Sequence, residues 1–466
     1  MRPRYARTKR AVCEMLHNWG VELRMAETRA LADFVARSEF EDLPHRLIDR
    51  CKVYVVDNLA AGFIGSLQPW TQTVASVAET LGGNPVATCF NRGKASRFDA
   101  SRAALVNGAA MGAFESEHIG HASHPSSTVF PAALAIAESH HLSGRALITA
   151  LLLGYEVVCR VGEAQTPAVE IERGFHNPGA NGTFGAAAAV GKLLGLDGLH
   201  LAWAFGIAGS SSGGLVEFVW EGAMTKRIHL GRASQLGLES ALLAKGGLTG
   251  PTTVLEGPYG YLHAFSPHPD VDKLVAGLGE RWLAEDLTIK AYPLHSTAQA
   301  IVHAIRLHPL DPSQVRHVKV TTPRGVPEKR YMNPAPTTML GAQYSLPFCI
   351  ALALTRDLSD PATLTESVLG DDLLRRIAAT VEVRSDPSAA ATVLEIETNE
   401  ERRTFTADSF PGSPGDPLDF DAASDKLRRY ARAASTPERI SRMIEIVHDL
   451  EQLEDTAHFA ALIASP

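Results

Sequence analysis

The pattern of apolar residues changes near residue 286, and this change most constrains the fold. Up to that point apolar residues recur at helical spacing, as in ETRALADFVARS, or form continuous runs typical of buried helices. The stretch STVFPAALAIAESHHLSGRALITALLLGYEVVCRVG predicts two helices that break at Ser143 and Gly144. We therefore expect a large all-helical domain over residues 27–285.

After residue 286 the sequence favours strands. VRHVKVTTP and TVEVRSD are short β-like runs, and ATVLEIETNEERRTFTAD predicts a hairpin with NEE at its turn. The linker FPGSPGDPLDF then leads into two amphipathic helices. We expect a mainly α fold with an inserted α+β lid: a smaller α/β lid domain over 286–420, and C-terminal helices over 421–466 that rejoin the helical domain.

Composition excludes several classes of protein. The net charge of −8 argues against a nucleic-acid partner, and no apolar run is long enough to predict a membrane span. The five cysteines lie far apart without a C-x-x-C pair, which argues against disulfides and Cys-ligated clusters and favours a cytoplasmic setting. The basic segment MRPRYARTKR permits a transit peptide, but we expect residues 1–26 to be a disordered extension.

The segment EHIGHASHPSS places His118, His121 and His124 three residues apart, behind Glu115 and Glu117. Three histidines suggest zinc, but proline 125 pushes the last histidine out of helical geometry, and no H-E-x-x-H motif is present. An acid–base site, a metal site and a solvated loop all remain open. The HPSS letters predict a helix start capped by Ser126 or Ser127, with free N–H groups suited to a carboxylate.

Other segments also carry ionisable groups in turn-rich contexts, and none decides the function alone. P-loop, dinucleotide and G-x-S-x-G patterns are absent from the sequence. The candidate residues are His176 in RGFHNPGANGTFG, Lys226, Arg227, His229 and Arg232 in GAMTKRIHLGRAS, Lys290 and His295 in TIKAYPLHSTAQA, and Tyr344 in GAQYSLPFCIALAL.

Taken in order, these segments resemble the MmgE/PrpD family over about residues 27–453. The matching stretches include HPSSTVFPAALAIAE, GFHNPGANGTFGAAAAVGKLLGL, TKRIHLGRASQLGLESALLAKGGLTGP, KAYPLHS and AQYSLPFCIALAL. The resemblance implies a helical domain with an α/β lid, usually a homodimer, and a site between the domains that needs no metal or organic cofactor. It places six residues on family active-site positions: His124, His176, Lys226, Lys290, His295 and Tyr344.

The chain departs from the family where a D-x-D-D-T run usually precedes the HP motif. Here the letters are ESEH, so Glu115 and Glu117 stand in for aspartates and His118 is expected to contact substrate.

The resemblance implies a lyase for a small di- or tricarboxylate, and dehydration of the 2-methylcitrate type is our first expectation. Decarboxylation of cis-aconitate, an iminodisuccinate-type epimerisation and a non-catalytic carboxylate binder are the alternatives. We expect His124 and His176 to transfer protons and the two lysines, Lys226 and Lys290, to stabilise negative charge. The expected substrate contacts are Glu115, Glu117, His118, His229, His295 and Tyr344.

Overall fold

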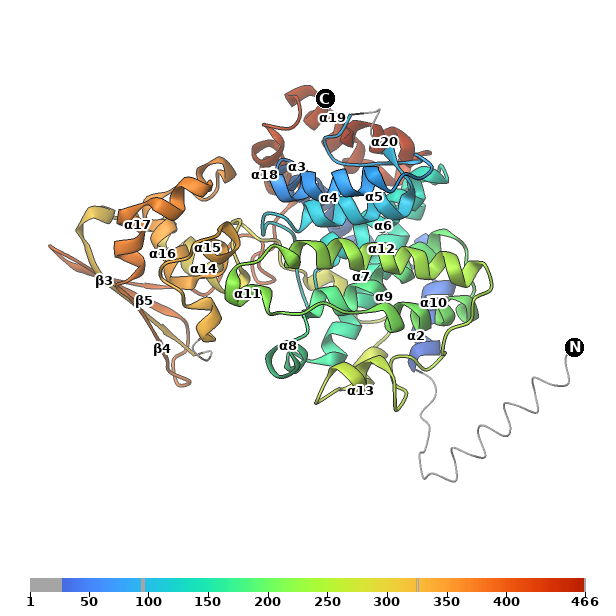
Figure 1. Cartoon of the computed structure of the whole chain (residues 1–466), viewed down its shortest axis with the longest axis horizontal. Helices are drawn as coiled ribbons and strands as arrows, with labels where there is room; N and C mark the ends of the chain where they lie inside the picture. Colours follow the sequence, from blue (N-terminus) through green and yellow to red (C-terminus); the bar gives the residue numbers. More distant parts are fainter. Residues whose placement is uncertain (1–26, 94–96, 324, 326, 465–466) are drawn as a thin grey trace, which may run out of the picture.

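The computed structural model describes residues 27–93, 97–323, 325 and 327–464 of the 466-residue chain. It has a large helical body and a smaller part that carries a four-stranded sheet (Figure 1). The expected fold class, mainly α with a small α/β portion, is confirmed. The N-terminal extension expected over 1–26 lies outside the described residues. Among the described helices, none is long and apolar enough to cross a membrane.

The helical body begins at the first described residue and runs to the loop before the sheet-bearing part. The break expected at Ser143 and Gly144 is confirmed, and the Ser143 hydroxyl accepts a hydrogen bond from the N–H of Ala146. A two-stranded ribbon, β1 (Ala87–Thr88) with β2 (Arg97–Phe98), interrupts the expected all-helical pattern. The helices are α2 (Glu27–Arg37), α3 (His45–Ser66), α4 (Pro69–Thr80), α5 (Ala100–Met111), α6 (Pro125–Ser139), α7 (Gly144–Gln165), α8 (Ala168–Arg173), α9 (Asn177–Leu193), α10 (Gly198–Ser211), α11 (Phe218–Glu221), α12 (Thr225–Lys245) and α13 (Tyr261–Phe265).

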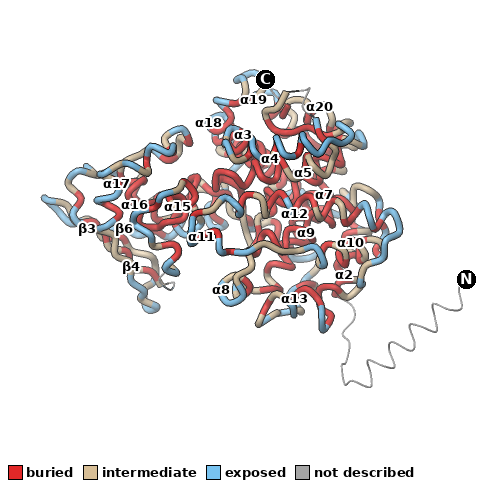
Figure 2. Tube along the Cα trace, viewed as in Figure 1, coloured by how far each residue is buried: buried red, intermediate tan, exposed pale blue. Residues whose placement is uncertain are grey.

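Helix α9 lies at the centre of the body and packs against α6, α7, α10 and α12. Its Ala- and Gly-rich sequence lets the neighbouring backbones approach closely. A Cβ on Gly185 would lie 2.8 Å from Val129 and Val158 and 2.9 Å from the carbonyl oxygen of Gly154. The buried residues in Figure 2 follow this layer of helices, while exposed residues follow the outer turns and the rim of the sheet.

The smaller part contains α14 (Gln299–Leu307), α15 (Met339–Tyr344), α16 (Leu346–Thr355) and α17 (Asp372–Ala378) beside a sheet of order β4-β3-β5-β6. The strands are β3 (Val315–Thr322), β4 (Val381–Ser385), β5 (Val393–Thr398) and β6 (Arg402–Thr406). β3 is parallel to β4 and antiparallel to β5. The expected hairpin is confirmed: β5 pairs antiparallel with β6 and the NEE letters form the turn.

The chain then returns to the body in α18 (Phe420–Ala431), α19 (Pro437–His448) and α20 (Thr456–Ile463). Helix α18 packs along α3, and α20 packs against α6 (Figure 1). The N–H of Gly144 donates to the carbonyl oxygen of Leu453, which joins the start of α7 to the C-terminal segment. Helices α18 and α20 therefore contact helices of the body.

Candidate active site

A cavity of about 300 Å³ is lined by residues of the helical body, of the segment that leads into the α/β part, and of α15 in that part. We call it the site cavity. Six of the residues predicted from sequence line it: Glu115, His124, His176, Lys290, His295 and Tyr344. Four others lie outside its wall: Glu117, His118, Lys226 and His229. The sequence analysis missed Glu170, Asn177, Phe218, Thr288 and Ser296, which also line it.

Two glutamates and two lysines form a buried charged cluster beneath the cavity: Glu115, Glu117, Lys226 and Lys290. Lys226 contacts Glu115 and lies 3.1 Å from a carboxylate oxygen of Glu117. Lys290 Nζ lies 3.0 Å from Glu115 and 3.6 Å from Glu117. All four side chains are at most 1% exposed. The lysines are therefore not free cations, because each is already paired before a substrate arrives.

The lysines keep both glutamates ionised despite their burial. Burial by itself would raise the pKa of Glu115, but the charges of Lys226 and Lys290 outweigh it and lower the pKa to about 2. The same balance holds the pKa of Glu117 well below its ordinary value. Burial would lower the pKa of Lys290, yet the two carboxylates raise it instead. The cluster consequently holds two negative and two positive charges at neutral pH.

The backbone that carries these acids is held in an unfavourable conformation. Glu115 has φ of 55°, and His121 and Ala122 have φ of 49° and 53°, all in the left-handed region. Each such residue costs about 1–3 kcal/mol, and strain of this kind gathers at functional sites. The turn at Glu115 leaves both Glu115 and Glu117 in contact with the two lysines.

His124 stands directly before α6, with φ of −124° and ψ of 75°, outside the helical region that a following proline disfavours. Its Nδ1 lies 2.8 Å from Glu117, so Nδ1–H donates to the carboxylate and Nε2 is left as the basic nitrogen. Burial lowers the pKa of His124, an effect that Glu117 only partly offsets. A neutral ring with a fixed tautomer can accept a proton.

The expected cap of this helix is wrong. His124 occupies the N-cap position and makes no side-chain cap hydrogen bond. Ser126 instead donates its hydroxyl to Asn58 on α3 at 2.8 Å. The proline starts the helix one residue before the serines, so Ser126 lies inside the first turn and not at the cap.

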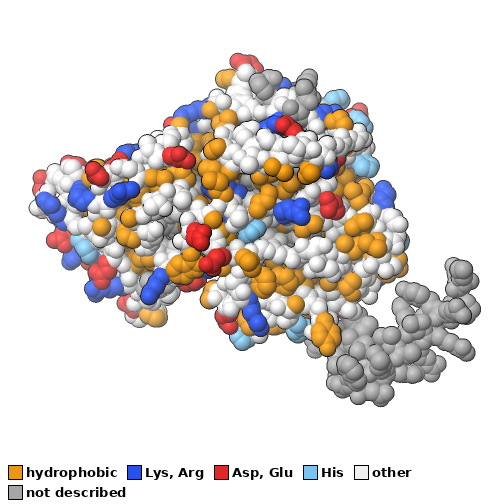
Figure 3. All heavy atoms as spheres, in the orientation of Figure 1, with side chains coloured by type: hydrophobic (Ala, Val, Ile, Leu, Met, Phe, Trp, Pro, Cys, Tyr) orange, Lys and Arg blue, Asp and Glu red, His pale blue; other side chains and the backbone are white. Residues whose placement is uncertain are grey.

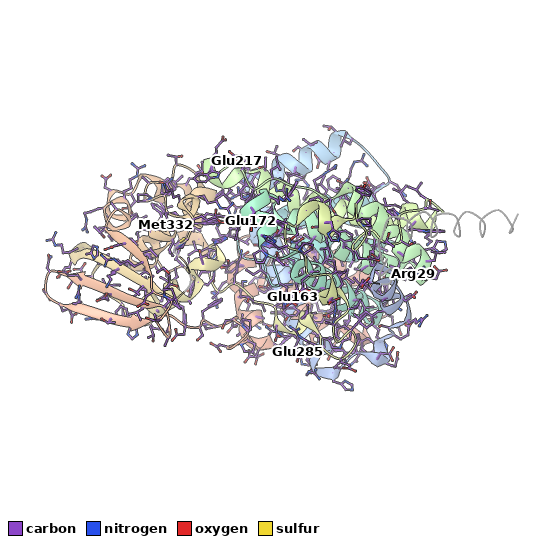
Figure 4. The ribbon with its side chains drawn as sticks, turned by 90° about the horizontal axis from the view of Figure 1, so that it is seen from below. Arg29, Glu163, Glu172, Glu217, Glu285 and Met332 are labelled. Atoms are coloured by element: carbon purple, nitrogen blue, oxygen red, sulfur yellow. The ribbon has the colours of Figure 1, made fainter. Side chains whose placement is uncertain are left out.

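The three histidines of the opening segment contact three different carboxylates. His118 Nδ1 lies 3.0 Å from Asp57, and His121 Nδ1 lies 3.0 Å from Glu163, a residue labelled in Figure 4. His124 contacts Glu117, so each of the three histidine rings is bound to a different carboxylate. In the described part of the chain, no group of three His, Cys, Asp or Glu side chains is arranged to hold a metal ion.

His118 does not reach the site cavity, contrary to the expected substrate contact. It is fully buried behind the cavity, where Asp57 holds Nδ1 and the rings of Tyr54 and Tyr155 pack against it. Asp57 in turn binds Lys426, whose ammonium also donates to the carbonyl oxygens of Ser116 and Lys290 at 2.8 and 2.9 Å. Lys426 on α18 therefore joins two of the three segments that carry the charged cluster, those of Ser116 and Lys290.

His176 and His229 form a pair at another wall. Their Nδ1 atoms lie 3.4 Å apart, and the rings of His124 and His176 have centroids 6.3 Å apart. Burial, reinforced by neighbouring His229, lowers the pKa of His176 well below its ordinary value. Burial also lowers the pKa of His229, to about 4. Only His176 of this pair lines the site cavity.

The α/β part contributes an aromatic wall. The ring of His295 lies 4.6 Å from that of Tyr344 and 4.8 Å from that of Tyr331, measured between centroids. Burial lowers the pKa of His295 to about 3, so this ring is neutral at physiological pH. Opposite them, Glu170 on α8 lies 3.3 Å from the Tyr331 hydroxyl and 3.4 Å from Arg330. Tyr331 and Arg330 lie behind the wall, and these contacts join the helical body to the α/β part beside the cavity.

Comparison with known proteins matches the MmgE/PrpD N-terminal domain to residues 29–274 and the MmgE/PrpD C-terminal domain to residues 291–452. The chain belongs to the MmgE/PrpD family. The resemblance read from the sequence is thus confirmed. The chain is 28% identical to cis-aconitate decarboxylase of Homo sapiens, covering 94% of this chain and 95% of that protein. It is 26% identical to cis-aconitate decarboxylase of Aspergillus terreus, covering 94% and 96%.

Proposed function

We propose that this protein is a lyase for a small di- or tricarboxylate, and that decarboxylation of a cis-aconitate-like substrate is its reaction. The observation that carries this proposal is the charged cluster, which presents Lys290 to a cavity lined by neutral histidines. Full-length similarity to cis-aconitate decarboxylases supports decarboxylation over other reactions of such a site. Dehydration of 2-methylcitrate, the first expectation from sequence, uses the same groups and remains the second candidate.

The proposed chemistry divides between three kinds of group. Lys290 donates a hydrogen bond to a substrate carboxylate and stabilises the charge that develops beside it when CO2 leaves. His124, whose Nδ1 is bound by Glu117, presents Nε2 to the substrate as a hydrogen-bond acceptor, and in the dehydration candidate the same nitrogen would be the base. His176 offers a proton to the carbon that loses CO2, and His295 and Tyr344 orient the substrate. Lys226 lies outside the cavity and acts by keeping Glu115 and Glu117 ionised.

Proton NMR of the purified, chelator-treated protein in D2O tests the reaction class. cis-Aconitate, 2-methylcitrate, citrate and iminodisuccinate are supplied separately, and loss of CO2, loss of water or deuterium incorporation is read directly. We expect CO2 loss from cis-aconitate. Turnover should fall about 10²–10⁴-fold in His124→Asn and Lys290→Met.

His200→Asn is the matched control, because His200 on α10 does not line the cavity and its ring contacts Asp197 and Trp203 at the same helix. If the protein removed water from 2-methylcitrate and released no CO2 from cis-aconitate, the proposed decarboxylation would be wrong and dehydration would take its place. Tight binding of these acids without any turnover would contradict the lyase and favour a carboxylate binder.

The homodimer and the cytoplasmic location are also part of this proposal. Hydrophobic side chains gather on the face that carries α12 (Figure 3), and Leu242, Leu243 and Leu248 are 40%, 47% and 50% exposed. An apolar surface of this kind suits association with a second copy. The described cysteines are free and buried, which suits a reducing compartment. Light scattering of the purified protein measures the oligomeric state, and a monomeric mass would contradict the dimer.

A further inference from the structure

Buried side chains hold the backbone of residues 113–117, the segment that carries both glutamates of the charged cluster. We call this segment the carboxylate turn. Glu115 within it has a left-handed φ of 55°, a conformation that persists only where the surroundings impose it. Three buried side chains from three different helices each donate a hydrogen bond to a backbone carbonyl of the turn. The pairs are Arg227 Nε with Ala113 at 2.9 Å, Gln343 Nε2 with Phe114 at 3.0 Å, and Lys426 Nζ with Ser116 at 2.8 Å.

Of these three donors, Gln343 alone comes from the α/β part, where it lies on α15 at the boundary with the helical body (Figure 1). Its Nε2 also donates to the carbonyl oxygen of Pro293 at 2.9 Å. Its own backbone carbonyl oxygen accepts the N–H of His295 at 2.9 Å. Gln343 therefore joins the carboxylate turn to the segment that carries Lys290 and His295.

The chemistry of the side-chain amide determines what this link needs. Both neighbours of Nε2 are carbonyl oxygens, which only accept hydrogen bonds, so the NH2 end must face them and both of its hydrogens are used. An ionised glutamate at position 343 would have no hydrogen to donate. An apolar side chain would leave both buried carbonyls without this donor. The link thus depends on the amide itself and not on the packing of the side chain.

The ion pairs of the cluster do not replace this link. Lys226 and Lys290 contact the two glutamates through flexible four-carbon stems and ammonium groups that donate in several directions. Such contacts tolerate a shift of the backbone on either side. Hydrogen bonds to backbone carbonyls hold the main chain directly. This difference matters because a misplacement of about 1 Å can lower the rate of a reaction about 100-fold.

We propose that Gln343 is a positioning residue, which holds the carboxylate turn and its partner His124 in register with Lys290 and His295. Glu117 carries the position of the turn to His124, whose Nδ1 lies 2.8 Å from that carboxylate. Gln343 does not line the site cavity, so it acts through the two segments that it joins. Its effect on turnover rests on the proposed function.

Steady-state kinetics of CO2 release from cis-aconitate test this role in the full-length protein. Gln343→Met keeps a side chain of similar length and removes both hydrogens. We expect its kcat to fall about 10- to 100-fold with KM within about threefold of wild type, because Lys290 and His295 remain on one segment and still bind the substrate. Gln343→Asn keeps the amide on a shorter stem, so it should keep one of the two bonds and lose only about 3- to 10-fold in kcat.

Gln235→Met is the matched control. Gln235 is also a buried glutamine whose side chain joins two others, Arg232 and Ser101, but it does not line the site cavity. Its kcat should stay within about twofold of wild type. A kcat within about twofold of wild type in Gln343→Met, or a loss confined to KM, would overturn the positioning role.

Hydrogen–deuterium exchange of the substrate-free protein tests the link without turnover. In Gln343→Met the backbone amides of residues 112–120 and 290–296 should exchange about threefold faster or more, whereas those of α9 should exchange as in wild type. Unchanged exchange in both segments would overturn the link, and equally faster exchange in α9 would show general destabilisation instead of positioning. If wild-type protein turned over no carboxylate, the proposed function would fail, and this measurement would still decide whether Gln343 holds the two segments.

Discussion

Replacing Lys226 by methionine should destabilise the protein by about 3–5 kcal/mol at pH 7. The side chain is fully buried and contacts both Glu115 and Glu117. Methionine keeps the length and packing of the lysine stem but removes the charge. Lys290 alone then faces two buried carboxylates, so one of them must take up a proton or remain uncompensated.

The magnitude follows from the ionisation of Glu115. Its pKa falls from an ordinary 4.5 to about 2 in the folded protein. At about 1.4 kcal/mol for each pH unit, this fall corresponds to about 3 kcal/mol of folding free energy, which Lys226 and Lys290 supply together. Breaking a buried ion pair typically costs about 3–5 kcal/mol, because it also leaves a charge uncompensated. A depressed pKa stabilises the fold above pH 4.5, and this contribution disappears as the pH falls toward 2.

Urea unfolding at pH 7 and at pH 4, followed by circular dichroism, measures this difference. In Lys226→Met the carboxyl left without a cation should have a raised pKa, so the variant and the wild type should differ more at pH 7 than at pH 4. The double variant Lys226→Met with Glu115→Gln removes the unpaired charge as well and should recover at least about 2 kcal/mol. A loss below about 1 kcal/mol at pH 7, or a loss independent of pH, would refute the assignment of these charges.

Three further predictions concern the surroundings of the cluster. Lys426→Met should lower kcat about tenfold or more and destabilise the protein by about 3 kcal/mol, because Lys426 joins the Ser116 and Lys290 segments. Lys426→Arg keeps the charge and should recover part of both losses. Steady-state kinetics measure the first loss and urea unfolding the second. Glu170→Gln should lower stability by less than about 1.5 kcal/mol but raise KM several-fold, because the Glu170 carboxyl group contacts Arg330 beside the cavity. An unchanged KM would contradict a role of this contact in closing the cavity wall. The pKa of His295 is about 3 in the folded protein and about 6.5 in the unfolded chain, so below pH 6.5 the unfolded chain takes up a proton that the folded protein does not. His295 should therefore lower stability by about 2 kcal/mol between pH 7 and pH 5. In urea titrations, His295→Asn should reduce this dependence of stability on pH.

Local patterns predicted the secondary structure well, because the signals are themselves local. The break before Gly144 carries a serine cap and a glycine start, and the hairpin turn falls on the NEE letters. The cap of α6 was mispredicted, because Pro125 fixes the first helical residue and moves the cap to His124. Where two local signals compete, proline geometry dominates over the capping preference of serine.

The site was predictable only where the motifs themselves supply the side chains. Lys290, His124 and His176 stand in recognisable segments, and the structure brings them to one cavity. Asp57 and Lys426 are separated by 369 positions, and nothing in their local sequence marks either as a partner of the other. Their contact depends on the packing of α18 along α3, which belongs to the tertiary structure.

The balanced charge of the cluster limits how substrate can be recognised. Two carboxylates already contact the two ammonium groups, so the cluster adds little net positive potential to attract a polyanion from solution. In the proposed function, affinity would then come from direct donors in the cavity wall, for which Lys290, His295 and Tyr344 are the candidates. Such short-range contacts form only when substrate is bound in the cavity, and added salt weakens them little. Under the proposed function, the cluster would stabilise charge that develops during the reaction more than it draws substrate in, which is the property that accelerates chemistry rather than binding.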